Sequence, residues 1–94
     1  MILVRDGQRY EGNWKNGKMN GVGEYTWPNG DHYIGEYLND LKHGKGVLKK
    51  VNGEVYDGTW KEGKQDGLGE STDEYGVVRI GKWANGIVLK WLAE

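Results

Sequence analysis

A 23-residue internal repeat constrains the fold of this chain more than any other feature. The pattern Tyr-x-Gly-x-Trp begins at Tyr10 and returns, with small changes, at Tyr33, Tyr56 and Arg79, each time 23 residues further on. All 17 glycines of the 94-residue chain fall into five columns of this frame. Self-similarity at a fixed period of this length indicates that each repeat is one supersecondary unit and that successive units stack.

Each repeat has the pattern of a β-hairpin. In the first copy, Tyr10, Gly12 and Trp14 alternate with polar residues, which is the two-residue period of a strand. The Asn-Gly pair at 16–17 is a turn signal, and a second alternating segment follows it and ends at Pro28. We therefore expect no helix, a turn region at 15–20 in the first hairpin, and strands at about 10–14, 21–27, 33–37, 44–50, 56–60, 67–72, 79–84 and 87–91.

The glycines inside these strands need a separate explanation. Glycine in a strand interior normally weakens the strand, and it usually marks a close approach by another group. Here a Trp or Tyr of the neighbouring strand can lie flat over the bare glycine backbone, which would hold a single-layer sheet together without a covering layer. The glycines expected to have this structural role are Gly12, Gly21, Gly23, Gly35, Gly44, Gly46, Gly58, Gly67, Gly69 and Gly81.

The spacing Y-x-G-x-W-x-x-G-x-x-x-G-x-G resembles the MORN (membrane occupation and recognition nexus) repeat. Residues 10–23 and 56–69 fit every position, whereas the middle copy has Tyr37 in place of Trp and Asp40 in place of Gly. Aspartate tolerates left-handed turn geometry, so the middle hairpin should still form. The resemblance implies an all-β fold, an elongated single-layer antiparallel sheet of successive hairpins that forms an open, solenoid-like array.

A single domain is expected over residues 1–94. Its full repeats are 10–32, 33–55 and 56–78, with a partial repeat and edge strand at 1–9 and a partial repeat at 79–94 that ends in a hairpin cap. An open sheet exposes an unpaired backbone edge at each end. Residues 2–4 and 87–92 are apolar edge segments, so a homo-oligomer formed through them is a further hypothesis.

Catalysis has little support in the sequence. His32 and His43 are not at metal-ligand spacing, and the chain has no cysteine that could complete a site. The carboxylates Glu11 and Asp57 share a column two repeats apart, which separates them by roughly 20 Å, too far for a paired-carboxylate mechanism. We expect no enzyme activity, cofactor or metal, and the net charge of −1 argues against nucleic acid as a partner.

The aromatic face is the predicted binding site. Large exposed apolar patches mark interaction sites, and Trp and Tyr are enriched at binding hot spots. This face should be more apolar in its N-terminal half, because Tyr25 and Trp27 give way to Leu48 and Lys50 and then to Ser71 and Asp73. The predicted function is a non-catalytic scaffold whose groove takes a peptide or helix, with Tyr33, Tyr37, Tyr56 and Trp60 at its centre and Tyr10, Trp14 and Trp83 beside them.

Binding of anionic phospholipid headgroups is the alternative function. Lys42, Lys45 and Lys49 are the candidate lipid contacts, but acidic residues such as Asp40 and Glu62 interleave with the lysines at the hairpin turns. Attraction to a membrane surface needs several unopposed cations. A regulatory repeat segment of a larger enzyme is the third alternative. The family resemblance implies a cytoplasmic protein with links to the cytoskeleton or to membranes.

Overall fold

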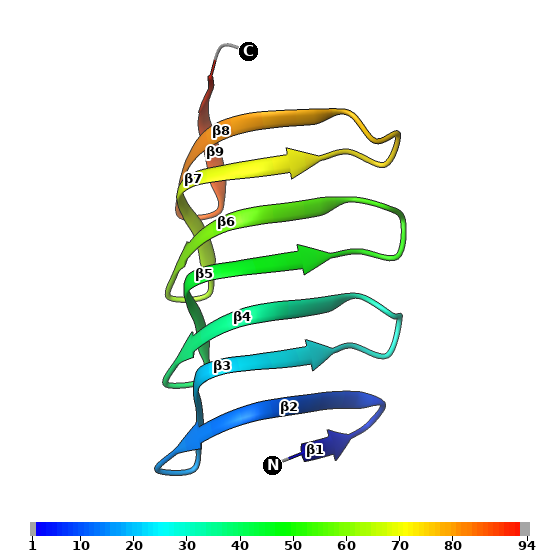
Figure 1. Cartoon of the computed structure of the whole chain (residues 1–94), viewed down its shortest axis with the longest axis vertical. Helices are drawn as coiled ribbons and strands as arrows, with labels where there is room; N and C mark the ends of the chain where they lie inside the picture. Colours follow the sequence, from blue (N-terminus) through cyan, green and yellow to red (C-terminus); the bar gives the residue numbers. More distant parts are fainter. Residues whose placement is uncertain (1, 93–94) are drawn as a thin grey trace.

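The computed structural model describes residues 2–92, and they form one nine-stranded antiparallel sheet in which the strand order follows the sequence (Figure 1). No residue in this range is helical, and hence no helix in it could cross a membrane. The prediction of an all-β array of successive hairpins is confirmed. The strands are β1 (Ile2–Arg5), β2 (Gln8–Lys15), β3 (Lys18–Thr26), β4 (His32–Leu38), β5 (Leu41–Lys49), β6 (Val55–Lys61), β7 (Lys64–Thr72), β8 (Val78–Ala84) and β9 (Ile87–Trp91).

The first strand, β1, and the last strand, β9, form the two edges of the sheet. They contain the apolar segments for which self-association was predicted, and that hypothesis stays a prediction. Residue 1 and residues 93–94, which were assigned to the terminal partial repeats, lie outside the described part of the chain.

Most strands are longer than expected because the hairpin tips contain only two residues. Lys15 pairs directly with Lys18, so the six-residue turn region predicted at 15–20 is wrong. Both residues of each tip have positive φ, as in the type I′ turns whose twist matches that of the flanking strands. Asp40 adopts this geometry with a φ of 72°, as expected. The tips are Asn16–Gly17, Asn39–Asp40, Glu62–Gly63 and Asn85–Gly86.

Backbone hydrogen bonds connect each hairpin to the next. At the first connection, Gly30 N–H donates to Trp27 O over 3.0 Å and Trp27 N–H donates to Asp31 O over 2.9 Å. The same pair of bonds recurs 23 and 46 residues later. The tips are also hydrogen-bonded to the preceding hairpin; for example, the N–H of Asp40 donates to Met19 O over 3.0 Å. Each hairpin is therefore held by its neighbour at both ends.

The strands are bent rather than straight, and they curve toward the hairpin tips (Figure 1). The register shifts in the middle of each full hairpin, between Gly35 and Tyr37 in the second, and such bulges bend the strand that carries the extra residues. Gly44, on that strand, has a φ of 71°. A side chain there would meet Glu36, which points away from the rings. The expectation that the glycines at 21, 44 and 67 lie under aromatic rings is therefore wrong, because positive φ breaks the alternation of faces.

The bend gives the single-layer sheet a concave face that can bury side chains. A Cβ added at Gly12 would lie closer than 3.0 Å to the backbone of Gly23 on the paired strand, so the aromatic face is sharply concave at these glycines. The molecule measures 41 × 25 × 16 Å along its principal axes. The two ends of the array lie at opposite ends of the longest axis (Figure 1).

Candidate functional site

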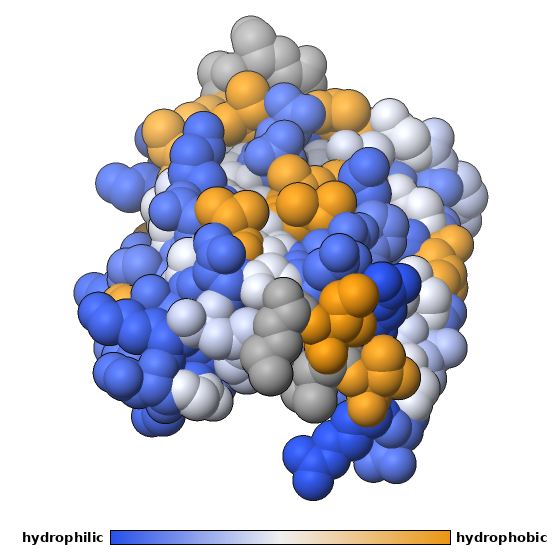
Figure 2. Space-filling view, turned by 60° about the horizontal axis from the view of Figure 1, so that its bottom comes forward, coloured by the Kyte–Doolittle hydropathy of each residue, from blue (hydrophilic) through white to orange (hydrophobic). Residues whose placement is uncertain are grey.

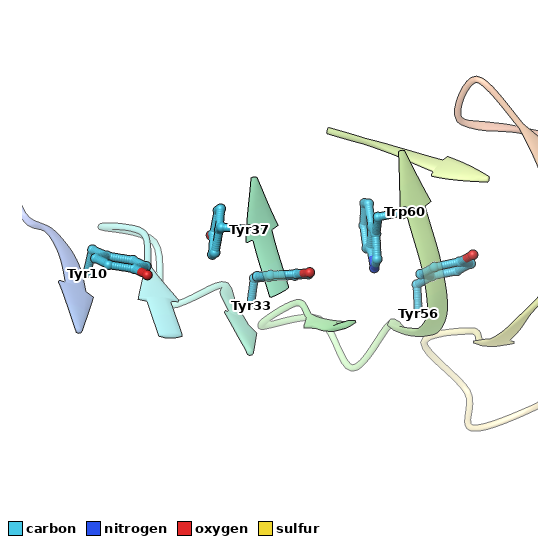
Figure 3. Packing of buried hydrophobic residues seen from close by; sticks show 5 residues of the cluster. All are labelled: Tyr10, Tyr33, Tyr37, Tyr56 and Trp60. Carbon is cyan, nitrogen blue, oxygen red and sulfur yellow. The ribbon is translucent and has the colours of Figure 1, made fainter. Parts of the chain in front are cut away.

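A continuous column of aromatic rings follows the concave face (Figure 3). Tyrosines from the first strand of each hairpin alternate with rings nearer the tips, and each ring packs edge-to-face on the next. Within the central hairpin, Tyr33 contacts Tyr37 at 5.3 Å and Trp60 of the following hairpin at 5.4 Å between centroids, with interplanar angles of 80° and 89°. The full series is Trp14, Tyr10, Tyr37, Tyr33, Trp60, Tyr56, Trp83 and Trp91.

The tyrosines of this column lie over glycines, as the sequence predicts. The Tyr33 hydroxyl donates to the backbone oxygen of Glu36 over 3.0 Å, and a Cβ on Gly46 would lie well within 3.0 Å of the Tyr33 ring. Tyr10 and Tyr56 make the equivalent contacts in the other two full repeats. A glycine is required at each position because any side chain would occupy the space of the ring.

The rings predicted at the centre of the groove are buried. Tyr33 is 0% exposed, Tyr56 4%, and Tyr37 and Trp60 6%. The expectation that these rings are exposed in an open groove is wrong, because the bend encloses them. Whether the column binds a partner stays a prediction, but a partner on this face would first contact the side chains that cover it.

Burial also removes the tyrosines from acid–base chemistry. Burial raises the pKa of the Tyr10, Tyr33, Tyr37 and Tyr56 hydroxyls above the usual 10.0, against the lowering effect of the backbone hydrogen bonds that Tyr10, Tyr33 and Tyr56 donate. These hydroxyls therefore stay protonated near neutral pH. Among the described residues, no group of three His, Asp or Glu side chains is placed to hold a metal ion.

Lys42 covers the middle of the column. Its Nζ lies 5.3 Å from the ring centroid of Trp27, 5.6 Å from that of Tyr33 and 5.4 Å from that of Trp60. Desolvation lowers the pKa of Lys42 below its usual value. Within residues 2–92, the single ion pair closer than 4 Å joins Arg9 and Glu11. Lys42 is thus a partly buried cation with aromatic neighbours and no carboxylate partner.

The three lysines predicted as lipid contacts do not form one patch. Lys42 lies on the aromatic face, whereas Lys45 and Lys49 are exposed. Lys45 is paired with Thr59, whose side chain lies on the opposite face, beside Gly67. Alternation places Lys49 on that opposite face as well.

A pocket of about 440 Å³ opens beside Lys42, where the first two full repeats meet. Trp27, Pro28 and Leu48 supply its apolar walls, and Asn29 and Asp31 also line it. Its position agrees with the expectation that the aromatic face is more apolar toward the N-terminus. Trp27 was expected on this face, but neither Trp27 nor Leu48 was among the predicted site residues.

The next junction along the array has a smaller and more polar pocket. It measures about 140 Å³ and is lined by Leu48, Lys50, Glu54, Val55, Tyr56, Gln65, Ser71, Thr72 and Trp83. Lys50, Gln65 and Ser71 stand one period after Trp27, Lys42 and Leu48. A comparison of these columns by residue type distinguishes the two junctions in the sequence, although it does not show that Lys42 lies close to Trp27.

Comparisons with known proteins agree with this architecture. Residues 10–32, 33–55 and 56–73, together more than half of the chain, match the family model of the MORN repeat. The ALS2 C-terminal-like protein of Homo sapiens is 40% identical over 38 residues, which are 40% of this chain and 4% of that protein. Alsin of Rattus norvegicus and of Homo sapiens is 40% identical over 40 residues, 43% of this chain and 2% of alsin. These matches span only a small part of each relative, but the family match covers the first two full repeats and residues 56–73 of the third, and the chain belongs to the MORN repeat family.

Proposed function

We propose that this chain is a non-catalytic scaffold whose concave aromatic face binds a peptide or helix of a partner protein. MORN repeats are generally interaction modules for proteins or membranes, and the family is generally non-catalytic. The proposal that a peptide or helix binds on this face rests on the pocket at the first junction, where Trp27, Pro28 and Leu48 surround the approach to Lys42.

The buried rings support this function indirectly. Tyr33 and Trp60 are fixed by edge-to-face packing, and the Trp60 indole N–H donates to Gly46 O over 3.1 Å. They form a rigid floor beneath Lys42, and a rigid surface loses little conformational entropy when a ligand binds. The partner would be recognised by the partly buried Trp27 above this floor, since Trp is enriched among binding hot spots.

A membrane surface fits the described surface less well. Lys42 is separated from Lys45 and Lys49, so these cations do not act on one plane. Exposed apolar side chains are dispersed among hydrophilic ones on the face seen in Figure 2 rather than forming one continuous area. A cytoplasmic location, with cytoskeletal or membrane association, belongs to the same proposal.

The proposal is tested by affinity capture from a cell extract followed by mass spectrometry. Wild-type protein should enrich a specific partner that Trp27→Ala loses, whereas Lys50→Ala, the same position at the second junction, and Val22→Ala, an exposed change on the opposite face, should retain it. Circular dichroism and melting curves would confirm that each variant is folded. Loss of the partner with Val22→Ala while folded Trp27→Ala still binds would show that the opposite face is the functional one.

A further inference from the structure

Lys42 occupies a position at which the fold does not require a cation. Met19, Gln65 and Val88 stand at the same place in the other hairpins, and each is paired with the corresponding tip-side ring, as Lys42 is with Tyr37. The sheet therefore accepts neutral side chains of different shapes in this column. The charge of Lys42 needs an explanation other than packing.

The surroundings of this cation favour contact with an anion. Burial of a charge is costly unless the charge is paired, and no carboxylate among the described residues lies within 4 Å of Lys42. The three neighbouring rings compensate in part, because cation–π contacts contribute roughly 0.5–1 kcal/mol at exposed sites and more when desolvated. A carboxylate that reached Lys42 from the pocket would add a charge-assisted hydrogen bond.

The only other charged side chain that lines the pocket is already engaged. Asp31 accepts a hydrogen bond from the Val51 N–H over 3.0 Å, and this bond holds the following connection in place. The walls beside Lys42 are Trp27, Pro28 and Leu48. A ligand group that fills this pocket would meet an apolar wall and a lysine ammonium, with the Asp31 carboxylate as the one negative charge in the lining.

We infer that the first junction recognises an acidic group next to a large apolar side chain in a partner peptide. Lys42 contacts the carboxylate, and the apolar side chain packs on Trp27 and Leu48. This inference rests on the proposed function and adds the chemistry of the ligand. The second junction has the charged Lys50 and the polar Ser71 in place of Trp27 and Leu48, and the uncharged Gln65 in place of Lys42, so it serves as an internal control.

The recessed position of the cation favours a peptide over a membrane. One lysine lies within a pocket of about 440 Å³, whereas membrane attraction depends on several cations at one surface. A single acidic side chain can enter such a pocket together with its apolar neighbour. Anionic lipid binding is therefore an opposing outcome of the test.

The test uses two small probes that differ in one group, a carboxylate or its neutral amide. N-acetyl-tryptophan carries a carboxylate beside an indole, and N-acetyl-tryptophanamide is its neutral counterpart. Each is titrated into isotopically labelled protein while amide and indole N–H signals are followed by nuclear magnetic resonance. We expect the strongest shifts at Trp27 and around Leu48, and about tenfold tighter binding of the carboxylate probe, equivalent to roughly 1.4 kcal/mol.

Matched variants then separate the contributions. Lys42→Met and Lys42→Gln, which introduce the side chains of repeats one and three, should abolish the preference for the carboxylate but leave binding of the neutral probe within about twofold, or roughly 0.4 kcal/mol. Trp27→Ala should weaken both probes, and Gln65→Met should change neither. Equal binding of the two probes, an unchanged preference in both folded Lys42 variants, or shifts confined to another surface would overturn the inference.

The same variants distinguish this inference from the proposed function. If a captured partner depends on Trp27 but not on Lys42, the scaffold function stands and acid recognition is wrong. If capture depends on neither residue, the proposed function fails at this face. Binding to phosphatidylserine vesicles that is lost in Lys42→Met, with no preference between the probes, would assign Lys42 to a membrane contact instead.

Discussion

The contact between Tyr33 and Gly46 predicts that one methyl group will strongly destabilise the sheet. In Gly46→Ala, the added Cβ would lie well within 3.0 Å of the Tyr33 ring, a separation that real Cβ atoms essentially never show. Gly46 does not have positive φ, so alanine adds no backbone strain. Tyr33 is 0% exposed and has no free space into which to move.

The expected cost follows from the contacts that the Tyr33 ring would lose. Overpacking of a well-packed interior costs typically about 1–3 kcal/mol. Displacing the ring also breaks its hydrogen bond to Glu36 O, worth about 1 kcal/mol, and disturbs its edge-to-face contacts with Tyr37 and Trp60, worth roughly 0.5–1.5 kcal/mol each. We expect Gly46→Ala to lower the free energy of unfolding by about 3 kcal/mol or more.

Urea unfolding followed by tryptophan fluorescence measures this cost, and Gly76→Ala is the matched control. Gly76 has a φ of +88° and nothing within 4 Å of an added Cβ, so alanine there causes only the left-handed backbone strain of roughly 1–2 kcal/mol. The loss at Gly46 should clearly exceed the loss at Gly76. If Gly46→Ala is no more destabilising than Gly76→Ala, covering of glycine by tyrosine does not hold the hairpins together.

Three further predictions follow from the turn geometry, the buried hydroxyls and Lys42. Glu62→Asn should raise the free energy of unfolding by about 0.5–1 kcal/mol in urea, because Glu62 has a φ of 51° in a turn that favours Asn; a loss of stability would contradict this. Stability should fall as pH rises above 10, because the folded-state pKa values of Tyr10, Tyr33, Tyr37 and Tyr56 are raised and the unfolded chain loses those protons first; tyrosinate absorbance from more than the two other tyrosines, before loss of the circular dichroism signal, would refute it. Lys42→Met should leave the thermal midpoint unchanged or slightly higher, and the free energy of unfolding should change by less than about 1 kcal/mol, because the desolvation of the cation is relieved while its cation–π contacts are lost. A marked fall in the midpoint would show that those contacts dominate.

The hairpin array was predictable because two local signals agree. The 23-residue columns place glycine and tyrosine in register, and alternation within each repeat gives the strand faces. The pairing of Gly35 with Gly46 and the ring of Tyr33 over Gly46 follow from those signals. The left-handed geometry of Asp40 was also predictable, because aspartate tolerates positive φ.

The burial of the ring column could not be predicted from alternation alone. Positive φ at Gly44 and its equivalents, Gly21 and Gly67, accompanies the register shift within each full hairpin and the bend of the strands. A period-two pattern contains no information about such a bend. An unbent sheet would have left Tyr37 and Trp60 exposed as a groove, which is what the pattern suggested. The bend also brings Lys42 from the tip region over the rings, so that its proximity to Trp27 appears only in three dimensions.

Some repeat columns are fixed by packing and others are free to vary, and this difference explains how one scaffold can carry different binding sites. The Tyr and Gly columns are fixed by packing, since Tyr33 has no space for a side chain at Gly46. The columns that contain Lys42 and Trp27 face the pockets, and their other members differ in charge and size without disturbing the strand pairing. Met19, Gln65 and Val88 show this for the first column, and Lys50 and Asp73 for the second. Because each junction combines one member of each column, its ligand chemistry is set by residues that the fold leaves free, and at the first junction these residues are the aromatic Trp27 and the cation Lys42.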